Sequence, residues 1–260
     1  MESFAAVEAV ANLHDPESEL SQLNAQAHLK PFKCSQLLWD ILQESRRAWE
    51  LSDGACDITV KPLMDLWGFY RKTQTAPPED EIYRCLETCG LEKVQFCDTG
   101  KSVYFTVPGM AIDLGGIAKG YALDLAKQRL SAERPDLKNG VIDLGGNLHL
   151  LGDKSLRVGI KSPSDPEKNA QVITLTPPLA VASSGDYERF VVLSGKKYGH
   201  IIDPGTGYPV QRDYAVSVWC NRAVDSDWLS TTMFLRGNDE KLKQNLLRHI
   251  PELQMKFVFK

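Results

Sequence analysis

Apolar residues in the N-terminal part of the chain recur every three or four positions, over residues 7–13 and again over residues 37–49. This spacing is typical of helices that bury one face. A helical turn is predicted over residues 61–69, ending at Gly68, and a short helix over residues 82–88. The N-terminal third is therefore expected to be mainly helical.

From about residue 94 the pattern changes to short runs rich in β-branched and aromatic residues, which is typical of strands. Strands are predicted over residues 94–97, 103–107, 110–114, 141–144, 156–160, 172–175, 190–193, 198–202, 215–220 and 255–259. Helices are predicted over residues 118–130, 227–235 and 240–249. This order is neither regular βαβ alternation nor all-β, so we predict an α+β fold with mixed or antiparallel sheets flanked by helices.

The composition is that of an ordinary globular protein. Of the 260 residues, 43% are apolar and 25% are charged, and 30 Lys and Arg against 34 Asp and Glu give a net charge of −4. A chain of this size buries a sizeable core in one large domain or two closely joined ones. The near-balanced charge argues against a nucleic-acid partner, and the longest apolar runs are too short for a membrane span.

The N-terminus and the cysteines say little about the cellular compartment. Residues 1–5 have no basic region, no apolar stretch of signal-peptide length and no nearby lipidation cysteine, so no export signal is expected and the localisation stays open. The cysteines lack the paired C-x2-C spacing of zinc sites and are expected to be reduced, partly buried thiols. They are Cys34, Cys56, Cys85, Cys89, Cys97 and Cys220.

Two glycines, Gly115 and Gly116, stand between a predicted strand and a predicted helix that carries Lys119 in its first turn. Glycines let a ligand approach the backbone, and the first N–H groups of a helix together with a lysine attract anions. A phosphate site and a plain tight turn are equally compatible with this string. Its spacing matches neither the dinucleotide-binding nor the P-loop pattern.

Two polar strings farther along are also candidates. The sequence Ser-Ser-Gly-Asp-Tyr at residues 183–187 is either an oxyanion-binding loop or, more commonly, only a loop. Strand alternation places His200 on the same face as Ile202, directly before dense turn chemistry at residues 203–209. A histidine at such a strand end either acts as a general base or has a purely structural role.

Asp227 and Thr231 are separated by one helical turn, so their oxygens are expected on the same side of a helix. Together with a backbone carbonyl and phosphate oxygens, such a pair suits the octahedral coordination of Mg²⁺. The alternative is that Asp225 or Asp227 caps the helix. Both hold together if Asp225 is the cap and Asp227 the ligand.

The aromatic string Leu-Trp-Gly-Phe at residues 66–69 follows Gly-Ala-Cys-Asp-Ile-Thr at residues 54–59. These aromatic side chains could supply a wall for a planar ring. Core packing is the more common use of such residues and is the favoured interpretation.

In their order along the chain, these strings resemble the ApbE family of flavin transferases, which are FAD:protein FMN transferases. The resemblance extends from about residue 15 to residue 237. The matching strings are residues 54–59, 62–63 with 66–69, 117–122 (Ile-Ala-Lys-Gly-Tyr-Ala), 145–146, 184–187, 200–204 with 206–207, and Asp227 with Thr231. The resemblance implies one α+β domain over residues 1–260, with an FAD site between its sub-domains.

The resemblance also implies a reaction and its residues. Members of the family bind FAD and Mg²⁺ and move FMN onto a Ser or Thr hydroxyl of a target protein, which releases AMP, and some hydrolyse FAD to FMN and AMP. Carried over position by position, the FAD site comprises His14, Ala55, Cys56, Asp57, Asp113, Lys119 and Ile202. The Mg²⁺ ligands are expected to be Asp227, Thr231 and the main-chain carbonyl of Gly116.

These assignments predict a mechanism in which Mg²⁺ and Lys119 neutralise the pyrophosphate while an acceptor hydroxyl attacks the FMN-side phosphorus and AMP leaves. His200, oriented by the turn around Asp203, is the candidate for assisting deprotonation of that hydroxyl, and Thr206 lies in the same turn. Two alternatives stay open. One is an FAD-binding protein without transfer activity, and the other is an FAD pyrophosphatase that uses water.

The chain departs from the family pattern at its N-terminus and at three other positions. Family chains usually begin with an export signal and a strand bearing Met-Gly-Thr that touches the flavin, and both are expected to be absent here. His14 stands where Tyr is usual, Cys56 where Phe or Met is usual, and Ser183 where Thr is common. These changes are expected to alter the contacts with the flavin.

Overall fold

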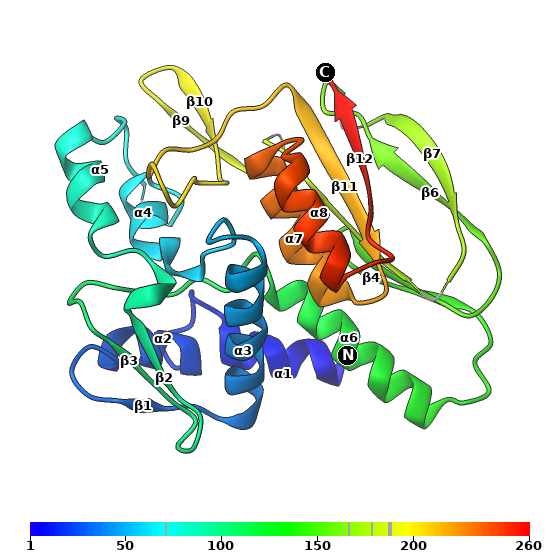
Figure 1. The fold of residues 1–260 in the computed structure, drawn as a ribbon, viewed down its shortest axis with the longest axis horizontal. Helices are drawn as coiled ribbons and strands as arrows, with labels where there is room; N and C mark the ends of the chain where they lie inside the picture. Colours follow the sequence, from blue (N-terminus) through cyan, green and yellow to red (C-terminus); the bar gives the residue numbers. More distant parts are fainter. Residues whose placement is uncertain (71, 166, 178, 187–188) are drawn as a thin grey trace. The chain divides into compact units, whose positions relative to one another are not determined.

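The computed structural model describes residues 1–260 except 71, 166, 178, 187 and 188, and the described residues form two compact units (Figure 1). Unit 1 comprises Met1–Phe4, Gly116–Glu188 and Gln211–Lys260, and unit 2 comprises Ala5–Gly115 and Arg189–Val210. Each unit is therefore built from segments that are distant in sequence. Within the described ranges, no helix is long and apolar enough to cross a membrane. The single domain expected over residues 1–260 stays a prediction.

Unit 2 contains most of the N-terminal helices and a small sheet. Its helices are the greater part of α1 (Glu2–Ala11), then α2 (Glu19–Gln26), α3 (Gln36–Leu51), α4 (Lys61–Leu66) and α5 (Glu79–Leu86), with the 3₁₀ turns η1 (Ile58–Val60) and η2 (Leu91–Lys93). Its antiparallel sheet has the order β1 (Phe32–Lys33), β3 (Ser102–Phe105), β2 (Val94–Cys97). A separate hairpin consists of β9 (Phe190–Leu193) and β10 (Lys196–Gly199).

One apolar cluster in unit 2 joins α4, α5 and the β9–β10 hairpin. Its buried members are Leu63, Met64, Trp67, Phe69, Ile82, Cys89, Leu193 and Ile202. The indole Nε1 of Trp67 donates to the carbonyl oxygen of Gly207 (2.8 Å), which fixes the turn at residues 203–209 onto this cluster. Trp67 and Phe69 are only 2% and 8% exposed, so core packing is confirmed for these aromatic side chains.

Unit 1 is built on a five-stranded antiparallel sheet. The strand order is β12 (Gln254–Phe259), β11 (Tyr214–Cys220), β8 (Leu179–Ser184), β5 (Asn147–Leu151), β4 (Gly140–Leu144). A second sheet pairs β6 (Leu156–Lys161) with β7 (Asn169–Leu175), and the helices are α6 (Ala118–Glu133), α7 (Ala223–Arg236) and α8 (Glu240–His249). Gly145 and Gly146 both have positive φ in the two-residue turn between β4 and β5, a conformation that glycine adopts without strain.

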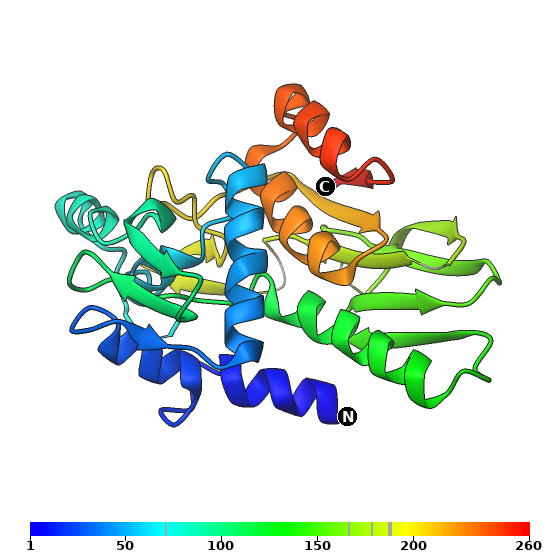
Figure 2. The ribbon, with the colours of Figure 1, turned by 60° about the horizontal axis from the view of Figure 1, so that its bottom comes forward.

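Strand alternation decides which side chains of unit 1 face its helices. In β5 and β8, Leu150 and Val181 pack against the apolar side chains of β6 and β7. The alternate residues of the same strands, which include Asn147 in β5 and Ser184 in β8, lie on the other face of the sheet. On that face α6 and α7 pack side by side (Figure 2). The central strands therefore present polar side chains to these two helices beside the apolar contact of Ala180 with Leu123 and Ala223.

The α+β class with antiparallel sheets and flanking helices is confirmed. The strand predicted over residues 110–114 is wrong. The backbone N–H and C=O of Ile112 are both bonded to the side-chain amide of Asn24 (2.7 and 2.9 Å), and Asp113 N donates to the carbonyl of Ile58 (2.7 Å). Because a side chain and a 3₁₀ turn satisfy these backbone groups, the segment does not join a sheet.

Several other boundaries differ from the sequence prediction, and two of these differences concern candidate site residues. The strand predicted over residues 198–202 ends at Gly199, and beyond it Ile202 makes only an isolated bridge with Pro209. Residues 183–184 form the end of the central strand β8 rather than a loop. Residue 187 of the same string lies outside the described residues.

Candidate active site

Unit 1 holds a buried carboxylate, Asp227, where α6 contacts α7. Gly120 N donates to its Oδ2 (2.8 Å), and Asn147 Nδ2 donates to its Oδ1 (2.7 Å). Gly120 lies in the first turn of α6, where backbone N–H groups have no partner within the helix. Asp227 is only 4% exposed and is held by two other elements of the same unit.

Glycine at position 120 lets the two helices approach this closely. A Cβ atom there would lie 2.3 Å from the carbonyl oxygen of Ala223 and 2.7 Å from Cβ of Asp227. These neighbours are backbone or the first atom of a side chain, so no rotamer change relieves the contact. The hydrogen bond between Gly120 and Asp227 therefore depends on the absence of a side chain.

The protein balances the charge of Asp227 only in part. Burial raises the pKa of Asp227 above its usual value, while the positive charge of Lys119 and the hydrogen bonds from Gly120 and Asn147 act to lower it. Each carboxylate oxygen has two lone-pair positions, and the bonds just described use one on each oxygen. A further cation beside Asp227 would stabilise its ionised form.

The other predicted metal ligands supply the same kind of donor atom. Thr231 lies one turn after Asp227, and its hydroxyl is 3.4 Å from Ser184 Oγ, which in turn is 2.8 Å from Ser230 Oγ. The exposed Gly116 precedes α6. A carboxylate, a hydroxyl and a carbonyl are the oxygen ligands that Mg²⁺ prefers, so these residues fit the ion, and the assignment stays a prediction. Among the described residues no group of three or more His, Cys, Asp or Glu gathers as an alternative site.

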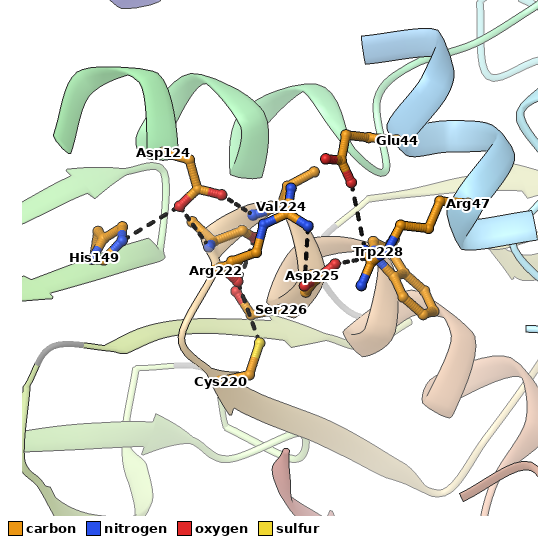
Figure 3. Close-up of polar contacts among 11 residues, drawn as sticks. Glu44, Arg47, Asp124, His149, Cys220, Arg222, Val224, Asp225, Ser226 and Trp228 are labelled. Carbon is orange, nitrogen blue, oxygen red and sulfur yellow. Dashed lines mark hydrogen bonds and ion pairs between the residues drawn. The ribbon is translucent and has the colours of Figure 1, made fainter. Parts of the chain in front are cut away.

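The start of α7 is fixed by Asp124, which belongs to α6. Its carboxylate oxygens accept hydrogen bonds from the first two backbone N–H groups of α7 (2.8 and 2.9 Å), and His149 Nε2 lies 3.4 Å from the same carboxylate (Figure 3). The helix consequently begins at Ala223. The predicted capping by Asp225 or Asp227 is wrong, because a neighbouring helix supplies the capping carboxylate.

In unit 2, the side chain of Asp57 is fully engaged by protein donors. Its Oδ1 accepts from the backbone N and the hydroxyl of Thr59 (2.8 and 2.6 Å), and its Oδ2 accepts from Trp49 Nε1 (3.2 Å) and Leu91 N (3.1 Å). Burial raises the pKa of Asp57, and the hydrogen bonds from Thr59 and Leu91 oppose that rise. Since four donors occupy the carboxylate, a flavin contact at this position would come from the backbone.

Three further residues of the predicted FAD site have buried side chains. Ala55, Cys56 and Ile202 are 7%, 9% and 6% exposed, and Ile202 belongs to the apolar cluster of unit 2. Lys119 differs from them, since it is exposed in the first turn of α6. All these assignments stay predictions.

Asp113 and His14, both predicted to contact FAD, lie around Tyr70. The Tyr70 hydroxyl donates to Asp113 Oδ2 (2.6 Å), and Gly115 N donates to Asp113 Oδ1 (2.7 Å). The ring of His14 meets the ring of Tyr70 edge-on, with 5.6 Å between the centroids. Unit 2 thus brings together two predicted site residues that are distant in sequence.

His200 follows β10 and is held by the carbonyl oxygen of Arg189. Its backbone N and its ring Nδ1 both lie 3.1 Å from that oxygen. Because a carbonyl only accepts, Nδ1 carries the hydrogen in this bond, and the lone pair of the neutral ring is on Nε2. The Asp203 carboxylate accepts from Gly205 N (2.9 Å), and orientation of His200 by the turn around Asp203 stays a prediction. Thr206 is exposed in that turn.

Four residues in these contacts escape the sequence analysis. They are Tyr70, Asp124, Asn147 and Arg189. Asn147 has a local signal, because residues 147–150 read Asn-Leu-His-Leu and alternate polar with apolar side chains. Tyr70, Asp124 and Arg189 have none, since the groups that they contact are distant in sequence or belong to the backbone.

A sequence profile of the ApbE family matches residues 1–255. The chain is 30% identical over 246 residues to the FAD:protein FMN transferase of Vibrio cholerae (92% of this chain, 72% of that protein) and 31% identical over 270 residues to the protein of the same name from Treponema pallidum (97% and 74%). The crystal structure of the ApbE protein from Thermotoga maritima matches with a TM-score of 0.90 at 31% identity, covering 99% of this chain and 84% of that one. The chain therefore belongs to the ApbE family of flavin transferase enzymes.

Proposed function

We propose that this enzyme transfers FMN from FAD to a serine or threonine hydroxyl of a target protein, in a Mg²⁺-dependent reaction that releases AMP. The observation that carries the proposal is the buried Asp227 of unit 1, whose pKa is raised by burial and is lowered only in part by the positive charge of Lys119. A buried carboxylate of this kind is costly unless a cation binds it, and such groups are concentrated at functional sites. The shared name of the Vibrio cholerae and Treponema pallidum relatives supports the transfer of FMN from FAD to a protein.

The oxygen donors of unit 1 are assigned to the metal and the phosphates. Asp227, the Thr231 hydroxyl and the Gly116 carbonyl would hold Mg²⁺, which when bound supplies Lewis-acid neutralisation of the pyrophosphate charge. Lys119 and the first N–H groups of α6 would bind phosphate oxygens, because a helix N-terminus and a lysine both attract anions.

The residues of unit 2 are assigned to the flavin and to proton transfer. Asp113 and His14 would contact the flavin half of FAD. His200 would accept the proton of the acceptor hydroxyl at Nε2, since its Nδ1–H is committed to Arg189. The hydroxyl oxygen forms a bond to the FMN-side phosphorus, and the bond from that phosphorus to the bridging oxygen breaks, so that AMP leaves with this oxygen.

The test is incubation of the enzyme with FAD, Mg²⁺ and the acceptor protein of the Vibrio cholerae relative. Flavin fluorescence on the denatured acceptor together with AMP supports the transferase. AMP alone identifies an FAD pyrophosphatase, and FAD binding without AMP identifies a binding protein, and either result contradicts the proposal. Asp227→Asn should abolish the Mg²⁺-dependent rate, whereas Asp239→Asn, at the N-terminus of α8, should retain it.

A further inference from the structure

We infer that Tyr70 is a positioning residue for this reaction: its hydroxyl sets the carboxylate of Asp113, and its ring holds Arg189, whose carbonyl sets His200. The inference rests on the proposed function, because it assigns Tyr70 to the support of residues that the proposal places in the FAD reaction. All four residues belong to unit 2, so the argument concerns contacts within one compact unit.

The first step is the orientation of Asp113. Its two carboxylate oxygens accept from two different donors, the Tyr70 hydroxyl on Oδ2 (2.6 Å) and the backbone of Gly115 on Oδ1 (2.7 Å). The 2.6 Å separation is that of a charge-assisted O–H···O⁻ bond, which is about twice as strong as a neutral one. Two donors on opposite oxygens fix the plane of the carboxylate, and the Gly115 bond alone leaves it free to rotate.

The second step is the contact between Tyr70 and Arg189. The guanidinium carbon of Arg189 lies 4.9 Å from the ring centroid of Tyr70, within the range of cation–π attraction. Arg189 Nη2 also donates to the carbonyl of Phe69 (2.8 Å), the residue before Tyr70. The Arg189 side chain is therefore tied to the Tyr70 segment through the ring and through the backbone.

The third step leads from Arg189 to His200. The carbonyl oxygen of Arg189 accepts both the backbone N–H and the ring Nδ1–H of His200 (3.1 Å each). A shift of Arg189 changes the position of the imidazole that the proposed mechanism uses as a base. Tyr70 thus touches His14 and Asp113 directly and acts on His200 through Arg189.

The protonation of Tyr70 suits a donor. Burial raises the pKa of its phenol, and the negative charge of Asp113 and the hydrogen bond to it raise that pKa further, while Arg189 acts in the opposite direction. The phenol consequently keeps its proton at neutral pH and donates it to the carboxylate. Lys61 Nζ, 5.2 Å from the ring centroid, is a second cation at this ring.

The experiment compares Tyr70→Phe with Tyr83→Phe as a matched control. Tyr83 is an exposed tyrosine of unit 2 whose hydroxyl also donates to a carboxylate, Glu79 Oε1 (2.9 Å). Calorimetric titration with FAD should show a roughly tenfold loss of affinity for Tyr70→Phe and no change for Tyr83→Phe. The KM for FAD should rise by a similar factor, and kcat should change less, because the hydroxyl acts on the binding group.

A double-mutant cycle with Asp113→Asn decides whether Tyr70 acts through Asp113. The double variant should bind FAD no more weakly than Asp113→Asn alone. Equal FAD affinity of wild type and Tyr70→Phe would overturn the inference and leave the proposed function intact. The same holds if the losses of FAD affinity in Tyr70→Phe and Asp113→Asn simply add in the double variant. A wild-type protein that binds no FAD would overturn both.

A second variant tests the other arm if Tyr70→Phe does not fold. Arg189→Lys keeps the charge but loses the planar guanidinium that spans the Tyr70 ring and the Phe69 carbonyl. Its kcat for FMN transfer should fall at least fivefold, and the pH profile of kcat should shift, since the group that orients His200 has moved. An unchanged profile and rate would overturn this arm.

Discussion

Gly120→Ala is the sharpest stability test, because two general effects predict opposite signs for it. Gly120 lies inside helix α6, and replacing a helical glycine by alanine normally stabilises a protein by about 1 kcal/mol. Here the added Cβ would lie 2.3 Å from the carbonyl oxygen of Ala223 and 2.7 Å from Cβ of Asp227. Ordinary contact requires that α6 and α7 separate by about 1 Å.

The separation has two costs that exceed the gain in helix propensity. Overpacking at a close helix contact costs about 1–3 kcal/mol. The hydrogen bond from Gly120 N to the buried Asp227 carboxylate (2.8 Å) is stretched, and a bond to a charged group contributes about 1.5–3 kcal/mol. We therefore expect the free energy of unfolding to fall by roughly 1.5–5 kcal/mol, after the gain from alanine is subtracted.

The assay is urea unfolding followed by far-UV circular dichroism, without Mg²⁺ or FAD, with hydrogen exchange of peptides from α6 and α7 to locate the loss. Gly116→Ala is the matched control, because no atom lies within 4 Å of a Cβ there and its φ is not positive. The free energy of unfolding of Gly116→Ala should equal that of the wild type or exceed it by roughly a few tenths of a kcal/mol, because alanine lowers the conformational entropy of the unfolded chain. If Gly120→Ala matched the wild type or exceeded it, the account of this helix contact would be refuted.

Three further outcomes are expected. Because burial raises the pKa of Asp227, the native state holds its proton more tightly than the unfolded state, and this stabilisation of the native state is present below the usual Asp pKa of about 4 and is lost as pH rises through the raised pKa. Urea unfolding across this pH range should show the loss of stability in the metal-free wild type and not in Asp227→Asn, and Asp227→Asn should not be stabilised by Mg²⁺. Equal pH profiles of the two proteins would contradict the assignment. Asp124→Ala leaves two N–H groups of α7 without their acceptor and should lower the free energy of unfolding by about 2–4 kcal/mol. The control Asp239→Ala removes the N-cap of α8, which satisfies one N–H group, and should lower it by about 1 kcal/mol. Equal losses in the two variants would argue against capping by Asp124. His200→Ala should lower kcat for FMN transfer by roughly 10²–10⁴-fold with the affinity for FAD nearly unchanged, and transfer at the wild-type rate would remove its role as base.

The sequence predicts elements best where periodicity is local. The bounds of β2, β9 and α8 coincide with the predicted ones, because a short β-rich run or helical spacing extends through each of them without interruption. Prediction fails where a distant group decides the backbone. The segment at residues 110–114 has the apolar composition of a strand, yet the side chain of Asn24 takes the hydrogen bonds that a neighbouring strand would need.

The candidate site shows the same division. The spacing of Asp227 and Thr231 is visible in the sequence because both lie on one helix. The capping of that helix is not, since Asp124 comes from α6, about a hundred residues earlier in the chain. The contact of Tyr70 with Asp113 is hidden for the same reason, because only the folded unit brings the two side chains together.

Asp57 and Asp227 are both buried carboxylates, and their hydrogen bonds distinguish them. Burial raises the pKa of both, so the shift alone does not distinguish them. Asp57 accepts four hydrogen bonds from protein donors, which fill its lone-pair positions and leave none for a ligand. Asp227 accepts two, at a helix contact where Gly120 already costs about 1 kcal/mol of helix propensity. Two unfavourable features at one contact, with lone pairs still available on the carboxylate, support the proposed cation site at Asp227.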